Sequence, residues 1–234
     1  MPEVRPGDDL AALIAQHCPP DLGDDDILVI ASKVVSKAEG RLVQLADVTP
    51  GEEARRLAEQ GKDPRLVQLV LDEAVEVLRA ERGVLIVETR HGFVCANAGI
   101  DVSNLPGDDT ALLLPEDPDA SARALRAGIP GRPAVVITDS FGRAWRIGQV
   151  EVAIGAAGLL VVDDWRGRSD AHGRELRATV AAVGDAVASM ADLARSKDAG
   201  EPAVLVRGLA RYVTPEDGPG AAALRRPRPD DLFR

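Results

Sequence analysis

The chain has 234 residues, of which 45% are hydrophobic and 28% charged, with a formal net charge of −10. This composition is typical of a globular protein, long enough to bury a sizeable core. The negative charge argues against a nucleic-acid partner, because a phosphate backbone requires a basic face, whereas a small phosphorylated ligand needs only local positive charge. No apolar run reaches the roughly twenty residues that span a bilayer, and the first residues do not resemble a signal peptide. We therefore expect a cytoplasmic protein that binds no membrane, in which Cys18 and Cys95 are reduced thiols.

The N-terminal half predicts a strand, a basic loop, two helices and then further strands. Residues 27–35 form an apolar run, which indicates a strand that leads into a lysine-bearing loop. Thr49 precedes Pro50 and acidic residues, a pattern typical of a helix N-terminus. Apolar residues continue at helical spacing, so two helices are expected within residues 49–81. Strands are then predicted over residues 83–89, 92–100 and 110–115.

The C-terminal half mixes the two kinds of element. Its patterns predict a helix over 119–129, a strand over 134–139, a helix followed by a strand within 150–162, a long helix over 175–197 and a strand over 203–209. Residues 213–234 are rich in Pro, Gly and Arg and are expected to form an extended tail. Without a regular alternation of strand and helix, the fold class is α/β in the mixed α+β sense, with residues 1–234 as a single domain.

Several common catalytic motifs are absent from the sequence. It contains no Gly-x-x-x-x-Gly-Lys-Ser/Thr segment, no Gly-x-Gly-x-x-Gly after a strand and no Gly-x-Ser-x-Gly. A P-loop, a Rossmann site and a serine hydrolase therefore have little support. His17, His91 and His172 share no spacing that would suit a zinc site.

Oxygen-bearing side chains follow two of the predicted strands. Asp101 comes after an apolar run, with Asn97 and Asn104 beside it, and Asp139 and Ser140 follow the strand over 134–139. Carboxylate, hydroxyl and amide oxygens without His or Cys suit a hard cation such as Mg²⁺ or Mn²⁺. The alternative is that each aspartate caps a turn or a helix, and the two interpretations are evenly balanced on these residues alone.

Basic side chains flank the same segments. Lys33 and Lys37 lie four residues apart, and Arg143 and Arg146 follow Asp139 closely. Such groups hold phosphates or carboxylates, but charged residues on a solvated surface are more common. Combined with a carboxylate-bound metal, they would describe a phosphoryl-transfer site without a P-loop.

Longer blocks of sequence carry a more specific signal. The segments "SKVVSKAEGRLV", "ANAGIDVSN", "LLPEDPDASARALR", "VVITDSFGRAWRIGQVEVAIGAAGL" and "PAVLVRGLARY" together resemble the coenzyme F420-0:γ-glutamyl ligase family, in its stand-alone form. The resemblance covers nearly the whole chain with the motifs in the same order. It implies an unusual two-lobed ligase fold with mixed sheets, neither P-loop nor Rossmann, and a homodimer.

The resemblance also implies a reaction. Members of this family use GTP to join L-glutamate to the deazaflavin coenzyme F420-0 and then add further γ-linked glutamates, through an acyl phosphate. The cofactors implied are GTP as co-substrate, Mg²⁺ or Mn²⁺, and K⁺. Two other functions stay open: a ligase acting on a different carboxylate acceptor, and a nucleotide-binding module without catalysis.

Carried onto this chain, the family pattern assigns roles to individual residues. The metal ligands would be Asp101 and Asp139, with Ser140 beside them. The GTP contacts would be Met1, Pro2, Glu3, Val4, Ser32, Lys33, Lys37 and Asn104. From chemistry alone, Arg143, Arg146 and Gln149 are further candidates for contact with phosphate or the acidic substrate. The chain departs from the family pattern at Asp185, which is offset by one position from an acid in the long helix, and over residues 194–202, where the match is poor.

Overall fold

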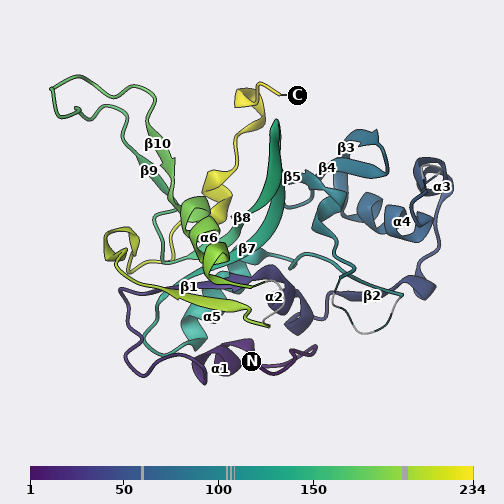
Figure 1. Ribbon diagram of the computed structural model, residues 1–234, viewed down its shortest axis with the longest axis horizontal. Helices are drawn as coiled ribbons and strands as arrows, with labels where there is room; N and C mark the ends of the chain where they lie inside the picture. The colour runs from purple at the N-terminus through teal and green to yellow at the C-terminus, as the bar shows by residue number, and fades with distance from the viewer. Residues whose placement is uncertain (59–60, 104, 106, 108, 197–199, 234) are drawn as a thin grey trace.

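The computed structural model describes residues 1–58, 61–103, 105, 107, 109–196 and 200–233. Its fold is mixed α+β, as the sequence predicts, with helices and several small sheets interleaved along the chain (Figure 1). Cys18 and Cys95 are unpaired thiols. Within the described residues, no helix is both long and apolar enough to cross a bilayer.

A four-stranded sheet forms the centre of the molecule. Its strands, in spatial order, are β11 (Ala203–Val206), β1 (Ile27–Ala31), β7 (Ala134–Arg143) and β8 (Arg146–Ala157). β1 and β7 run parallel, and the other two pairs are antiparallel. β1 and the first half of β7 are almost entirely buried, as expected for apolar strands that are covered on both faces.

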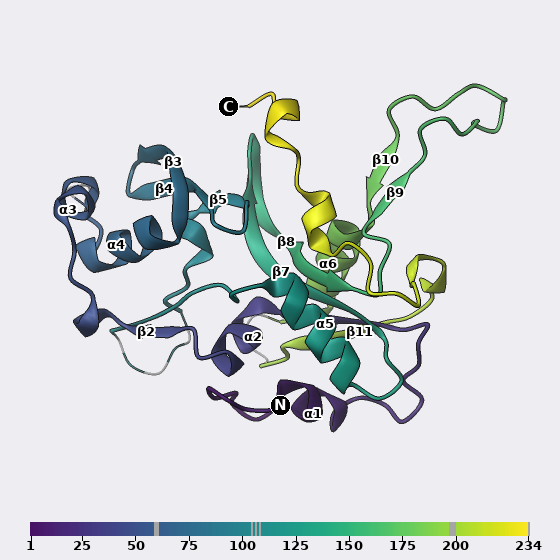
Figure 2. The same cartoon turned by 180° about the vertical axis from the view of Figure 1, so that it is seen from behind.

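Helices cover both faces of this sheet. Alternate side chains of β1 and β7, including Leu28 and Ile137, join a core with α1 (Leu10–Ala15) and α5 (Pro118–Gly128). The intervening side chains, including Val29 and Val136, join a second core with α6 (Val183–Ala194). In Figure 1, α6 lies in front of the sheet. In the opposite view of Figure 2, α5 lies in front of it. The period-2 alternation of the strands therefore divides the core into two layers.

A smaller group of elements lies to one side of the central sheet (Figures 1 and 2). A three-stranded sheet of β3 (Ala74–Glu81), β4 (Val84–Thr89) and β5 (Val94–Ala96) packs there against α3 (Glu52–Ala58) and α4 (Pro64–Glu73). The pair β2 (Leu42–Gln44) and β6 (Thr110–Leu112) lies below α4 in Figure 1, where Ala111 of β6 and Leu69 of α4 belong to one apolar cluster. The division of the chain into two lobes stays a prediction.

Three sequence-based predictions of local structure were wrong. The lysine-bearing segment is a helix, α2 (Ser32–Ala38), in which Lys33 and Lys37 lie four residues apart on one face. Residues 74–81 form strand β3, where burial alternates residue by residue, and not the end of a helix. The expected helix after residue 150 is the second half of β8. Gly155 lies within this strand and lets α5 pack closely against it. A Cβ at position 155 would lie 2.2 Å from the carbonyl oxygen of Pro118, at the start of α5.

Two helix boundaries also differ from the prediction. α3 begins at Glu52 rather than at Pro50, and the Gly51 amide donates a hydrogen bond to the Gln68 side chain. α6 begins at Val183, because the residues before it belong to a long hairpin. This hairpin is closed by β9 (Val162–Asp164) and β10 (Val180–Ala182) and projects from the body of the molecule (Figure 1).

The C-terminal residues follow the surface of the central unit. Ala221 is 1% exposed and belongs to the core beneath α6, while Leu232 and Phe233 are exposed. Short 3₁₀ turns complete the fold: η1 (Leu45–Asp47), η2 (Asn97–Gly99), η3 (Ala210–Tyr212), η4 (Ala221–Leu224) and η5 (Arg228–Asp230).

Candidate functional site

Several of the predicted site residues meet where β1 ends beside β7. The last pair between these strands is Ala31 with Thr138, so Ser32 begins α2 where Asp139 passes beyond the central part of the sheet. The Ser32 hydroxyl donates a hydrogen bond to Oδ1 of Asp139 at 2.9 Å. The sequence placed Asp139 at the end of a strand, which was wrong, because β7 continues to Arg143 as a two-stranded ribbon with β8.

Asp139 is in an unfavourable electrostatic environment for a carboxylate. Its removal from water raises its pKa to about 7, and the charges of Glu151 and Asp101 contribute to this rise, against the hydrogen bond from Ser32. The Cys95 thiol lies in the same region, where burial and the charge of Asp139 raise its pKa to about 12. A concentration of carboxylates with one raised pKa is an arrangement common at functional sites.

Asp101 is held by the first lysine of α2. Lys33 Nζ lies 2.6 Å from Oδ2 of Asp101, and it also donates to the Ser103 carbonyl and hydroxyl oxygens at 3.1 and 3.3 Å. The Ser103 amide donates to the other carboxylate oxygen at 2.7 Å. Burial alone would raise the pKa of Asp101, but the hydrogen bonds from Lys33 and Ser103 and the lysine charge together lower it. Asp101 is therefore an anion whose present partner is a cation.

Ser140 points to the other face of the β7–β8 ribbon, as alternation along a strand requires. Its hydroxyl donates to Glu151 Oε1 at 2.6 Å, and these two residues are directly paired in the ladder. Arg195, just after α6, approaches Glu151 Oε2 at 3.4 Å and donates to the Thr138 hydroxyl at 3.2 Å. Sequence reasoning missed Glu151 and Arg195, although a lone acid between apolar residues in "QVEVAI" was a signal that could have indicated Glu151.

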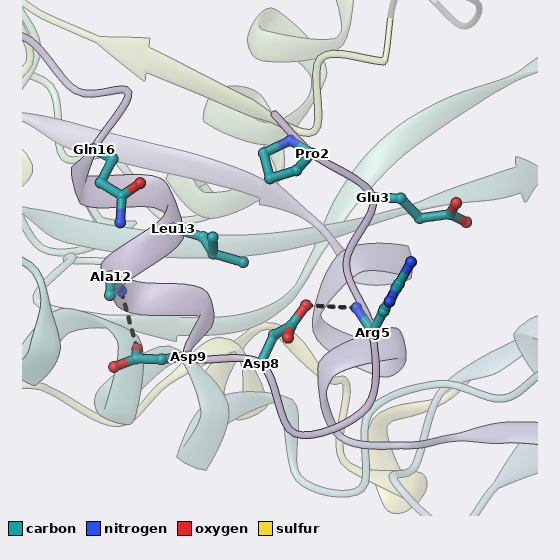
Figure 3. A pocket seen from close by; sticks show the side chains of 8 residues that line it. All are labelled: Pro2, Glu3, Arg5, Asp8, Asp9, Ala12, Leu13 and Gln16. Atoms are coloured by element: carbon teal, nitrogen blue, oxygen red, sulfur yellow. Dashed lines mark hydrogen bonds between the residues drawn. The ribbon is translucent and has the colours of Figure 1, made fainter.

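The N-terminal segment reaches the second lysine of α2. Lys37 Nζ lies 3.4 Å from Glu3 Oε1, and the lysine side chain is only 12% exposed. Pro2 and Glu3 line an open hollow together with α1 (Figure 3), and its other polar walls include Asp8 and Asp9. Because three carboxylates outnumber the single guanidinium of Arg5 in its lining, this hollow is an unsuitable site for phosphates.

The remaining predicted residues fall into three groups. Val4 is buried in the core, and Met1 packs against the same core. Asn104 lies outside the described residues. The last group is further along the β7–β8 ribbon, where the structure exposes it to solvent: Arg143, Arg146 and Gln149.

The donor set suits a hard cation, but the carboxylates are not arranged as a closed cluster. In the part of the chain that the structure describes, no three His, Cys, Asp or Glu side chains form a ready ligand set. Three carboxylates nevertheless lie close enough for Asp101 and Glu151 to raise the pKa of Asp139. A divalent cation would relieve this repulsion, and its preferred oxygen ligands are present. The residues therefore fit such a metal, provided that Asp101 exchanges the Lys33 ammonium for it.

Comparison with known proteins shows the family of the chain. Residues 1–208 match the family model described as F420-0:Gamma-glutamyl ligase. The chain belongs to this family. Two similar proteins, both named Coenzyme F420:L-glutamate ligase, come from Methanopyrus kandleri, with 47% identity over 99% of this chain and 94% of the relative, and from Methanothermobacter thermautotrophicus, with 46% identity over 100% and 96%. A third of the same name, from Haloarcula marismortui, is 48% identical over 88% of this chain and 84% of its own length. The chain is thus a ligase of the class that forms carbon–nitrogen bonds.

The two places where the chain departs from the family pattern differ in structure. Asp185 lies in the first turn of α6, where its Oδ1 accepts a hydrogen bond from the Ala153 amide at 3.0 Å, and burial raises its pKa. It ties the helix to β8. In the segment 194–202, Arg195 reaches the ribbon next to the site, whereas residues 197–199 lie outside the described part of the chain.

Proposed function

We propose that this protein is a GTP-dependent ligase that adds L-glutamate to coenzyme F420-0, and further γ-linked glutamates, in the biosynthesis of coenzyme F420. The observation that carries the proposal is the meeting of Ser32, Lys33, Asp101 and Asp139 at the junction of β1, α2 and β7, in a chain of the F420-0:γ-glutamyl ligase family. The names of the three relatives supply the acceptor and the amino acid.

The chemistry explains why such a junction is needed. A free carboxylate is a poor electrophile, so an oxygen of the acceptor carboxylate first attacks the γ-phosphorus of GTP and GDP leaves. The amino group of glutamate then attacks the resulting acyl phosphate, phosphate leaves, and the nitrogen loses a proton to give the amide. Both the triphosphate and the acceptor are anions, so their approach requires concentrated positive charge.

The basic residues of α2 are well placed to supply that charge. Lys33 and Lys37 lie one helical turn apart, four residues from each other, and therefore on one face of α2. Their present partners, Asp101 and Glu3, are carboxylates that a triphosphate would replace. Ser32, at the start of the helix, holds Asp139 in place.

In this proposal Asp101 and Asp139 would hold Mg²⁺ or Mn²⁺, while Ser140 and Glu151, hydrogen-bonded to each other on the opposite face of the ribbon, would not be direct ligands. The ion, when bound, neutralises phosphate charge and orients the γ-phosphoryl group. Release of Lys33 from Asp101 then frees the ammonium for a phosphate oxygen. A bound K⁺ and a homodimer belong to the same proposal by family resemblance.

The test is a product assay on the purified protein with GTP, Mn²⁺, L-glutamate and coenzyme F420-0. We expect the acceptor to gain mass in steps of one glutamyl residue, with GDP and phosphate released in equal amounts. Asp101→Asn and Asp139→Asn should abolish the product, while Asp185→Asn serves as a control for the loss of a buried carboxylate. An unchanged acceptor would contradict the proposal and favour a different carboxylate acceptor if GTP is still hydrolysed when other acids are supplied. Binding of GTP without turnover on any acid would favour a nucleotide-binding module.

A further inference from the structure

An exposed apolar surface lies at the free end of the β7–β8 ribbon. Trp145 at the turn is 82% exposed and Ile147 is fully exposed, while the C-terminal Leu232 and Phe233 are 85% and 68% exposed. The Trp145 and Phe233 rings contact each other in a tilted arrangement, with centroids 5.0 Å apart. Figure 1 shows the C-terminus beside the end of this ribbon, and Figure 2 shows the same from behind. We call these four residues the ribbon tip.

The ribbon tip is joined to the site by a single strand. Trp145 is the sixth residue after Asp139, which corresponds to about 20 Å along an extended chain, and less where the ribbon twists and turns. Arg143 lies between them and donates a hydrogen bond to the Ile147 carbonyl at 3.0 Å. Within the described part of the chain, the Arg146 guanidinium forms no hydrogen bond or ion pair. The order along the ribbon is therefore carboxylate, then cations, then apolar rings.

We propose that the ribbon tip binds the deazaflavin ring of the acceptor, so that β7 and β8 hold the acceptor along its whole length. This inference rests on the proposed function. The acceptor carries a planar aromatic ring at one end and the reacting carboxylate at the other, with a phosphodiester between them. With the carboxylate at Asp139, the phosphodiester falls near Arg143 and Arg146, and the ring falls on Trp145 and Phe233.

The chemistry of the ribbon tip favours this ligand over a second copy of the chain. A planar ring stacks well on the Trp145 face, and the nearby arginines complement a phosphodiester. A second copy pairing through its own ribbon tip would bring the arginines of the two copies close together, and these like charges would repel. The two occupants predict different experimental results.

The experiment compares Trp145→Ala and Trp145→Phe with the wild-type protein. The ligase assay gives KM values for coenzyme F420-0 and for GTP, and equilibrium dialysis gives the dissociation constant of the acceptor without turnover. A second acceptor is assayed in which a methyl ester of the phosphate replaces the part that carries the deazaflavin ring. This acceptor keeps the reacting carboxylate and the phosphodiester but has no ring. Sedimentation velocity of each variant reports its oligomeric state, and Trp165→Phe is the matched control for loss of a tryptophan on the projecting hairpin.

We expect Trp145→Ala to raise the KM and dissociation constant of coenzyme F420-0 about tenfold, the size of a lost stacking contact. The KM for GTP, the kcat and the KM for the ring-less acceptor should stay unchanged, and Trp145→Phe should restore most of the affinity. Wild-type KM values for coenzyme F420-0 in Trp145→Ala would overturn the inference while leaving the ligase function in place. A change of oligomeric state in Trp145→Ala would overturn it in favour of a second copy. Absence of ligation in the wild type would contradict the proposed function. It would not decide the inference about the ribbon tip, which the dialysis experiment tests without turnover.

Discussion

Two carboxylates near the central sheet, Asp119 and Asp139, differ sharply in their surroundings. Asp119 accepts hydrogen bonds from three backbone amides, those of Ala156, Ala221 and Ala222, at 2.9, 2.7 and 3.2 Å. Asp139 accepts one hydroxyl, from Ser32, and faces the negative charges of Glu151 and Asp101. Asp119 is held by three backbone amides, whereas Asp139 is buried, has fewer donors and lies near the charges of two other carboxylates.

The difference separates a structural role from a functional one. Asp119 joins α5, β8 and the C-terminal segment, and Gly220 leaves room for it, since a Cβ there would lie 2.4 Å from the carboxylate. Its charge is compensated within the protein. The charge of Asp139 is not compensated in this way, so it destabilises the folded state, and the proposed cation would relieve that cost. A metal site that is formed before the ion binds would carry such a cost, because its carboxylates are held near one another without a compensating charge.

The largest effect is expected from Asp139→Asn. The amide keeps the shape of the side chain but cannot replace a charged metal ligand, so the rate of glutamyl transfer should fall by at least about a thousandfold. The metal-free variant should at the same time be more stable than the wild type at pH 8, by about 2 kcal/mol, because a buried charge beside two others is removed. Product mass spectrometry and urea denaturation measure the two quantities. A variant that is both inactive and less stable would contradict this account of Asp139.

Asp119→Ala should show the opposite pattern. Three amides lose their acceptor, and we expect the free energy of unfolding to fall by about 2–3 kcal/mol. The kcat of the folded fraction, measured at low temperature, should remain within about twofold of the wild type. A loss of kcat comparable with that of Asp139→Asn would mean that Asp119 also serves the reaction.

The pH dependence of stability tests the account of Asp139 further. The folded-state pKa of Asp139, about 7, lies above its ordinary value, so the folded protein retains this proton longer than the unfolded chain does. Its contribution to stability is therefore complete below about pH 4 and is lost as the pH rises through about 7, with a slope of at most about 1.4 kcal/mol per pH unit. Denaturation of the metal-free protein at several pH values, with Asp139→Asn as the reference, isolates this contribution. If the pKa of Asp139 were the same in the folded and unfolded protein, the difference in free energy of unfolding between wild type and Asp139→Asn would not change with pH, and the account would be contradicted.

The smallest effect is expected at Glu3. Its carboxylate pairs with Lys37 at 3.4 Å but is 66% exposed, and such pairs contribute little to stability. Glu3→Ala should change the free energy of unfolding by less than about 0.5 kcal/mol. It should lower the KM for GTP modestly, because the Lys37 ammonium would no longer have to break its ion pair with Glu3 before it contacts a phosphate. An increase in that KM would instead indicate that Glu3 itself contacts the nucleotide.

Much of the fold was predictable from local pattern. The strand containing Val136, the strand over Val84–Thr89 and the helix Pro118–Gly128 all follow from uniform apolar runs or from helical spacing with an N-cap aspartate and proline. The helix α2 was not predicted, because its paired valines have high strand propensity and it has no side-chain cap. β3 follows α4 without a turn residue, so only the change in burial pattern at Ala74 marks the boundary.

The residues of the candidate site that were predictable are those within sequence segments that resemble the family. Asp101, Asp139, Ser32 and Lys33 were selected from the sequence, and the structure brings them together. Glu151 and Arg195 were missed, because their proximity depends on the register of β7 with β8 and on where α6 ends. Such register and packing relations join residues far apart in the chain, and no local pattern encodes them.

The most direct test of the account is the affinity of Mn²⁺ for the protein with a non-hydrolysable GTP analogue, measured by isothermal titration calorimetry. The account predicts stoichiometric binding to the wild type, at least about a hundredfold weaker binding to Asp139→Asn and Asp101→Asn, and wild-type affinity in Asp185→Asn. Equal affinity in the wild type and Asp139→Asn would contradict it, because the charge of Asp139 would then have no cation to hold.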